Sequence, residues 1–419
     1  MKKRIAALIL SSALVAGAAV GFAGCGGSSG GTITLWGPSA QQDSLQEMVN
    51  LFLEKNPDYG LEIKLGVAGE GDAYSMMSND PQSGADVFAY ANDQIANLYS
   101  LGALARLGDA AVTDLKTNNT EDSVNAGKIG DGYYGYPYAA DNGFFMYYDK
   151  SVVSEEQAKT LKGVMDACAA AGKYFIYQLT TGWYAGSFIY GAGGKYEVTY
   201  SGSSVSDIVC NFDEKLPGSD YTYGELGGQQ LMDIKTHDAF VDGDDNVISS
   251  YLQGINGTSR FGACISGTWN AGLIESYLGE NYAATVLPTW ESSLNGETYA
   301  WKSFAGYKLY GVNAFSKNLS KAHQLAAFLS SKDMQEKRFD DSAIGPANKA
   351  VAAMDKVKNN VAISTITRQI AENSVIQTAM PGSYWTEMES FANAMKSWDG
   401  SGNLLERVQQ LVTALKANG

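Results

Sequence analysis

The fold is decided by the opening of the globular part of the chain, residues 32–65, which read TITLWGPSAQQDSLQEMVNLFLEKNPDYGLEIKL. Residues 32–36 alternate and are rich in β-forming side chains, which indicates a first strand. Apolar side chains at helical spacing then predict a helix over residues 44–55, ended by the Asn-Pro-Asp that follows. Residues 61–65 alternate again. This strand–helix–strand order predicts a parallel sheet covered by helices, the α/β class.

The rest of the chain changes character along its length. Residues 86–90 form a short apolar run typical of a buried strand, and residues 94–101 have the spacing of a helix. Residues 182–223 are rich in Gly, Tyr and Ser, whereas residues 321–337 and 351–419 are mostly helical in pattern. No repeat of the period that marks solenoids is present.

The first residues indicate export. Lys2, Lys3 and Arg4 precede an apolar run over residues 5–20, and the small residues after it end at Cys25. This order is typical of a secretory signal over residues 1–24. Phe22-Ala23-Gly24-Cys25 resembles a bacterial lipobox, so we expect Cys25 to be lipidated, with residues 25–31 as a flexible Gly/Ser tether. The expected location is the extracellular face of the cell membrane. An ordinary cleaved signal with an incidental cysteine is the alternative.

The charge of the chain excludes one class of partner. Without the leader's three basic residues the chain has 27 basic against 45 acidic residues and a net charge of −18. A surface so negative is unsuited to the phosphate backbone of nucleic acids. Anionic lipid headgroups would repel it as well, so attachment to a membrane would depend on the lipid.

Motifs for catalysis and cofactors are scarce. The two histidines, His237 and His323, lie in no nucleophile or metal motif, and there is no P-loop or dinucleotide fingerprint. We expect no cofactor and no catalytic residues, although a glycosidase pair could hide among the 45 acidic residues.

Two further groups of residues have simple structural readings. Residues 242–246, DGDDN, resemble a calcium loop but lack its turn glycine and closing glutamate, so a solvated turn is expected and no metal site. Cys168, Cys210 and Cys264 fit no metal knuckle or disulfide scaffold, and we expect buried free thiols, with one bridge as the alternative.

Aromatic residues beside polar ones, at loop positions after strand-like runs, are the feature that points to a ligand. Sugar rings present apolar C–H faces and a rim of hydroxyls, so a sugar site needs flat aromatic platforms and polar side chains. Any one aromatic residue could instead belong to the core. The candidates are Tyr90 with Asn92 and Asp93, Tyr138 with Asp141 and Asn142, Trp183 with Tyr184, and Trp269 with Asn270.

The chain from Ile33 to near its C-terminus resembles the maltose-binding-like, family 1 extracellular solute-binding proteins of ABC importers. The resemblance rests on an ordered set of segments: ITLW at 33–36, GADVF at 84–88, GYPY at 135–138 with YYDK at 147–150, GTW at 267–269 and TVLP at 285–288.

The family resemblance implies two α/β lobes of the type II periplasmic-binding-protein kind, each a mixed sheet flanked by helices, that close on a sugar. The expected N-terminal lobe comprises residues 32–139 and 310–354, and the C-terminal lobe residues 144–304 and 361–419. Hinges are expected near residues 140–143, 305–309 and 355–360.

The resemblance also implies roles for single residues. Tyr90, Trp183, Trp269 and Trp385 fall on stacking positions, and Asp93 and Asp141 on acids that bind sugar hydroxyls. Gln94 stands where a basic residue is frequent and Thr181 where an acid is, so the exact sugar stays open.

The implied partners are a malto-oligosaccharide or a related oligosaccharide and the ABC permease subunits. The alternatives are a surface glycoside hydrolase and a carbohydrate-binding adhesin.

Overall fold

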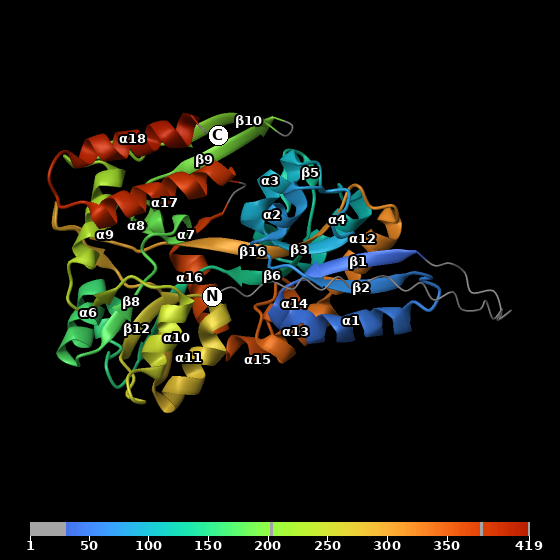
Figure 1. The fold of residues 1–419 in the computed structure, drawn as a ribbon, viewed down its shortest axis with the longest axis horizontal. Coiled ribbons are helices and arrows are strands. Elements are labelled where there is room, and N and C mark those ends of the chain that lie inside the picture. The colour runs from blue at the N-terminus through green and yellow to red at the C-terminus, as the bar shows by residue number, and fades with distance from the viewer. Residues whose placement is uncertain (1–30, 202–203, 378–379, 418–419) are drawn as a thin grey trace, which may run out of the picture.

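The computed structural model describes residues 31–201, 204–377 and 380–417. The expected leader, Cys25 and nearly all of the tether therefore lie outside the described residues. Within the described part, no helix is long and apolar enough to cross a membrane. The described chain forms two sheets with helices packed around each (Figure 1).

The first sheet has strand order β17-β16-β3-β1-β2, with β6 also paired to β16. Strands β1, β2 and β3 run parallel, while β16 is antiparallel to β3 and β6, so the sheet is mixed. The strand bounds are β1 (Thr32–Gly37), β2 (Glu62–Val67), β3 (Val87–Ala91), β6 (Tyr136–Asn142), β16 (Ser303–Val312) and β17 (Ser374–Ile376).

Helix α1 (Gln42–Lys55) shows how the sequence makes this layer. Leu45, Met48, Val49 and Phe52 are buried at helical spacing and join one core cluster with Ile33 and Leu35 of β1. The helix ends at Lys55 with Asn56 as its C-cap, before a proline that cannot continue it. The predicted strand–helix–strand unit is therefore confirmed, with the helix starting two residues earlier. The other helices around this sheet are α2 (Ala73–Ser78), α3 (Ile95–Ser100), α4 (Asp109–Asn118), α5 (Glu121–Asn125), α12 (Leu319–Leu329) and α13 (Lys332–Ser342).

The second sheet has strand order β11-β8-β12-β7-β13 and is also mixed. Its two faces bury different clusters, because side chains alternate along β7: Met146 and Tyr148 join one cluster, and Phe145 and Tyr147 the other. The strand bounds are β7 (Phe145–Asp149), β8 (Tyr174–Ile176), β11 (Phe240–Val241), β12 (Phe261–Ser266) and β13 (Tyr282–Thr285).

Helices cover both faces of the second sheet. One face packs under α6 (Leu161–Ala170), α7 (Gly182–Ala185), α8 (Ser187–Ala192), α9 (Tyr223–Lys235), α17 (Gly382–Ser397) and α18 (Leu404–Ala417). The other packs under α10 (Asp245–Gln253), α11 (Ala271–Leu278), α14 (Lys349–Ala352), α15 (Asp355–Lys358) and α16 (Val361–Glu372). The remaining described strands form short antiparallel pairs: β4 (Lys128–Ile129) with β5 (Gly132–Tyr133), β9 (Tyr196–Ser201) with β10 (Ser204–Cys210), and β14 (Trp290–Glu291) with β15 (Thr298–Tyr299).

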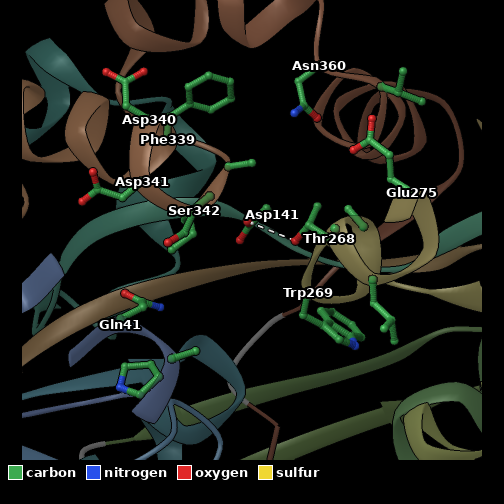
Figure 2. Close-up of a pocket in the computed structure, with 18 of the residues that line it drawn as sticks. Gln41, Asp141, Thr268, Trp269, Glu275, Phe339, Asp340, Asp341, Ser342 and Asn360 are labelled. Atoms are coloured by element: carbon green, nitrogen blue, oxygen red, sulfur yellow. Dashed lines mark hydrogen bonds between the residues drawn. The ribbon is translucent and has the colours of Figure 1, made fainter. Parts of the chain in front are cut away.

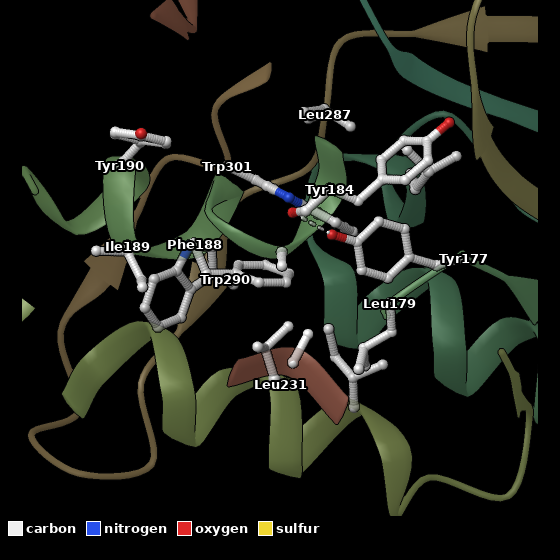
Figure 3. Close-up of a cluster of buried hydrophobic side chains, with 14 of the residues drawn as sticks. Tyr177, Leu179, Tyr184, Phe188, Ile189, Tyr190, Leu231, Leu287, Trp290 and Trp301 are labelled. Carbon is white, nitrogen blue, oxygen red and sulfur yellow. Dashed lines mark hydrogen bonds between the residues drawn. The ribbon is translucent and has the colours of Figure 1, made fainter. Parts of the chain in front are cut away.

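Much of the aromatic-rich middle of the chain is core rather than binding surface. Trp301 stacks on Phe188 with ring centroids 4.3 Å apart, and its ring nitrogen donates to Ser187 Oγ at 2.7 Å. Figure 3 shows these rings packed with Tyr177, Tyr184 and Trp290. The hydroxyl of Tyr177 donates to the Tyr184 carbonyl at 2.8 Å. The ring nitrogen of Trp301 and the hydroxyl of Tyr177 thus find hydrogen-bond partners inside this buried cluster.

The chain passes between the two sheets where β6 meets β7. Gly143 lies at this point, and a Cβ there would come within 2.6 Å of the Phe304 carbonyl oxygen, so only glycine lets the two segments approach. One helix differs from the expected lobes: α14, from the segment assigned to the first lobe, buries Val351 in a cluster of the second sheet. Strand β17 pairs with residues 303–305 of β16, the end of that strand that the expected boundaries assign, like β17, to the second lobe and its hinge. The ten-residue β16 is long enough to bind β17 at one end and β3 at the other.

The cysteines and the acidic turn have the simple roles expected. Cys168, Cys210 and Cys264 are buried and free, and burial raises the pKa of Cys210 to about 11. Asp244 is the N-cap of α10, where its carboxylate accepts the backbone N–H groups of Asn246 and Val247. In the described part of the chain no group of three or more His, Cys, Asp or Glu side chains could hold a metal ion.

Candidate functional site

Two neighbouring chambers that share lining residues lie between the sheets. The large chamber has a volume of about 950 Å³ and the small chamber about 300 Å³. Both are lined by the same three residues, Glu70, Trp269 and Lys308, which we call the junction. Figure 2 shows the large chamber, where Asp341 and Ser342 of α13 face Trp269 and Glu275. Together the chambers have the size of a small-molecule site.

Trp269 is an aromatic platform held in place by its neighbours. It lies on the 3-10 turn Thr268–Asn270, after β12, and is 45% exposed. Its ring nitrogen donates to Asp245 Oδ2 at 3.1 Å, while Asn270 Nδ2 donates to Asp245 Oδ1 at 2.6 Å. A Cβ at Gly267 would lie 1.9 Å from the Trp269 ring, so the glycine gives the ring its place. An exposed indole in a fixed orientation suits the apolar face of a sugar.

The small chamber brings Asp93, Asn142 and Trp183 together. Asp93 lies on the 3-10 turn Asn92–Gln94, directly after β3. Burial raises the pKa of its carboxyl, and a hydrogen bond from Gln94 at 3.1 Å opposes this shift. Trp183 is the second residue of α7, and its ring centroid lies 5.2 Å from that of Phe304. An acid, an amide and an indole thus meet in one chamber.

Asp141 lines the large chamber, but its side chain is only 1% exposed. Its Oδ1 forms an ion pair with Lys308 Nζ at 3.2 Å. Its Oδ2 accepts the Gly345 N–H at 2.9 Å and the Thr268 hydroxyl at 3.2 Å (Figure 2). The carboxylate therefore contacts three protein groups, although its Oδ1 has no partner among the described residues besides the Lys308 ammonium. The expected role of Asp141, an acid that binds sugar hydroxyls, stays a prediction.

Three of the predicted contact residues do not reach the chambers. Tyr90 is completely buried beside Phe88, because all five residues of the central strand β3 are buried. Asn92 is 1% exposed, and its amide donates to the Gln377 carbonyl at 2.8 Å and accepts the Tyr307 N–H at 2.9 Å. Both are structural residues, so their prediction as ligand contacts is corrected.

Trp385 is the third of these residues. Trp385 is absent from the described residues that line either chamber. Its ring centroid lies 5.9 Å from that of Trp183 and 5.6 Å from that of Phe304. In this structure Trp385 supports the Trp183 platform instead of lining a chamber.

Sequence reasoning missed the two charged members of the junction. Glu70 lies in the loop after β2, where its Oε1 accepts the Tyr138 hydroxyl at 2.7 Å and Gln41 Nε2 at 3.3 Å. Lys308 lies within β16, whose other residues are all buried. A lysine inside an otherwise apolar strand is a signal that could have found it, because a charge there needs a partner or a cavity. Glu70 gave no such signal.

The fold and this cleft define a two-lobed solute-binding protein, and the comparisons give its family. The chain belongs to the bacterial extracellular solute-binding protein family, whose model matches residues 47–365. The galactooligosaccharide-binding protein of Bacillus subtilis (strain 168) is 26% identical over 349 residues, which are 82% of this chain and 79% of that protein.

Solved structures share the fold over nearly the whole chain. One, a complex with acarbose, has a TM-score of 0.80 at 27% identity and covers 93% of this chain and 99% of its own. The maltodextrin-binding protein MalE1 from L. casei BL23, solved without ligand, has a TM-score of 0.76 at 22% identity, with coverage of 93% and 99%. These matches establish the two-lobed α/β architecture and the solute-binding class.

Proposed function

We propose that this protein captures a neutral oligosaccharide in the two chambers and delivers it to an ABC importer. The observation that carries the proposal is the junction, where an exposed indole lies beside a carboxylate acceptor and an ammonium donor. Stacking by Trp269 and hydrogen bonds to Glu70 and Lys308 match the two kinds of surface that a sugar presents. The names of the relatives above support the same ligand class.

Malto-oligosaccharides are the first ligands to test, and galacto-oligosaccharides the second. The acarbose complex at 27% identity favours the first class, and the Bacillus subtilis relative at 26% identity favours the second. The combined volume of the chambers has room for several sugar rings.

The deciding experiment is a calorimetric titration of residues 26–419 with maltotriose, β-1,4-galactotriose, acarbose and a monosaccharide control. Saturable binding of one trisaccharide, tighter than that of glucose or galactose, is expected. Failure of all of these sugars to bind would contradict the proposal. Chromatography after long incubation tests the absence of catalysis, since new reducing ends would instead support a hydrolase.

The proposal includes attachment to the outer face of the membrane through Cys25. In the native host, full-length protein is expected in the membrane fraction, and Cys25→Ala in the soluble fraction. Cys168→Ala is the matched control, because that cysteine is buried in the second core and should not affect location. Equal partitioning of the wild type and Cys25→Ala would contradict the anchor.

A further inference from the structure

Lys308 occupies an unusual place, in the middle of a central strand. It pairs with Ala91 of β3 on one side and Ala139 of β6 on the other. The register of β16 against β6 shifts on both sides of Lys308, between Gly306 and Lys308 and again between Lys308 and Leu309. Such irregularities re-aim a side chain and are frequent near binding sites. The result is a lysine whose side chain is 13% exposed and lines both chambers.

The charges around Lys308 keep it protonated. Burial lowers the pKa of the Lys308 ammonium, but the carboxylates of Asp141 and Glu70 outweigh that effect and raise the pKa above its ordinary value. A charged ammonium has three N–H donors and accepts nothing. Its ion pair with Asp141 leaves donors for a ligand in the chambers.

Asp141 has the opposite character. Its side chain is almost fully buried, and Lys308, Gly345 and Thr268 all contact its carboxylate. Because only 1% of the Asp141 side chain is exposed, against 13% for Lys308, a sugar hydroxyl has little access to that carboxylate. The exposed face of the pair is therefore the ammonium.

We propose that Lys308 is the specificity-determining donor of the hinge strands and that Asp141 is a positioning residue that acts through it. This inference rests on the proposed function and names the chemistry of its ligand. One sugar ring lies on Trp269, and its hydroxyls lie between the Lys308 donor and the Glu70 acceptor. Asp93 and Glu70 line the small chamber beside Lys308, so the ammonium donor and two acids lie around the same chamber.

The first test compares Lys308→Met with Lys308→Arg in titrations with maltotriose and β-1,4-galactotriose. Methionine keeps the length of the side chain and removes the charge, so affinity should fall about ten- to hundred-fold, the usual effect of losing a charge-assisted hydrogen bond. Lys308→Arg restores a donor and should recover part of the affinity. Lys302→Met, the same substitution just before β16, is the control and should bind like the wild type. Thermal unfolding shows that each variant folds.

The second test asks whether Lys308 contacts the sugar directly and whether Asp141 acts only by positioning Lys308. Monodeoxy derivatives of the bound trisaccharide are titrated into the wild type and into Lys308→Met. We expect one hydroxyl whose removal weakens binding to the wild type at least five-fold and leaves binding to Lys308→Met unchanged. Asp141→Asn should weaken the wild type but add little to Lys308→Met, because both changes remove one interaction. If Lys308→Met folds poorly, the double variant Asp141→Asn with Lys308→Met takes its place in the titrations with monodeoxy sugars, because it has no buried, unpaired acid.

The outcomes distinguish this inference from the proposed function. A wild type that binds neither trisaccharide overturns both proposals. A wild type that binds while Lys308→Met binds equally well overturns the role of Lys308 alone. Fully additive losses from Asp141→Asn and Lys308→Met overturn the positioning role, because they would place both groups on the sugar independently.

Discussion

Trp269 differs from the core tryptophans of the chain in its exposure to solvent and to the chambers. Trp290 and Trp301 are buried in the second core, whereas Trp269 is 45% exposed and lines both chambers. Its ring nitrogen is fixed by Asp245, so the platform has a set orientation before a ligand arrives.

Replacing Trp269 with alanine should weaken sugar binding at least ten-fold and leave the fold intact. Loss of the indole removes apolar contact area worth on the order of 2 kcal/mol. Calorimetric titration measures the effect. Tyr277→Ala is the matched control, because Tyr277 is also 47% exposed but is not among the described residues that line the chambers. Equal losses in both variants would mean that Trp269 is not a platform.

Asp93 should show a conflict between stability and binding. Burial raises the pKa of its carboxyl, so folding favours the protonated form and the charged form is a cost at neutral pH. Asp93→Asn should therefore unfold at the same or a higher temperature at pH 7, with the difference vanishing as pH falls. The same change should weaken sugar binding by about 1.5–3 kcal/mol, the usual worth of a charge-assisted hydrogen bond.

The pH dependence of affinity completes this test. As pH falls through the raised pKa of Asp93, the wild type loses its charged acceptor and should bind more weakly. Asp93→Asn has no such group and should bind equally across the same range. An identical pH profile for both proteins would remove Asp93 from the site.

At the residue scale, the sequence placed about half of the candidate site. Asp93 and Trp269 lie on turns just after strands, Asn142 is the last residue of β6 and Trp183 lies in α7, and all four line a chamber. Tyr90 was misplaced because it was read as the residue that follows a buried strand, whereas β3 continues through Tyr90 to Ala91 and buries all five of its residues. Glu70 meets the site through the packing of separate strands, and no local pattern reports such a meeting.

At the scale of elements, α7 is positioned by close contact with α17. A Cβ at Gly182 would come within 2.3 Å of the Trp385 carbonyl oxygen, so the two helices touch backbone to backbone. Because Trp183 is the next residue, the same contact helps to set the position of the Trp183 ring in the small chamber.

Gly182→Ala should push α7 away from α17 and disturb the Trp183 platform. Overpacking of this kind costs about 1–3 kcal/mol of unfolding free energy, and sugar affinity should fall several-fold with it. Denaturant unfolding and titration measure the two effects. Gly108→Ala is the control, because a Cβ at Gly108 would meet no described atom within 4 Å. Unchanged affinity in Gly182→Ala would show that α7 does not set the platform.

The elements themselves were partly readable from the sequence. Helix α1 was predicted within two residues, because four apolar side chains at helical spacing face the sheet. The pairing of β17 with β16 was not, since the two strands are about sixty residues apart and only three residues long where they meet. Strands this short are specified by the sheet that receives them rather than by their own pattern.

At the scale of the molecule, the two sheets are joined by few segments. The chain crosses at Gly143, where β6 of the first sheet gives way to β7 of the second, and β16 lies beside that crossing. Glu70 and Asp93 reach the chambers from the first sheet, and Trp183 and Trp269 from elements of the second. A ligand that touches both sets is expected to bind best when the sheets are closest.

Closure on the sugar is therefore the expected response of the whole molecule. We propose hinges near residues 140–143, 305–309 and 355–360, and a sugar that contacts both lobes shifts the population toward the closed state. Small-angle X-ray scattering should show a smaller radius of gyration when residues 26–419 are saturated with the trisaccharide that binds. Trp269→Ala, measured with sugar at a concentration just sufficient to saturate the wild type, is the control and should compact less. Tight binding without compaction of the wild type would contradict the clamp, even with the sugar correctly assigned, because it would mean that one lobe alone supplies the binding energy.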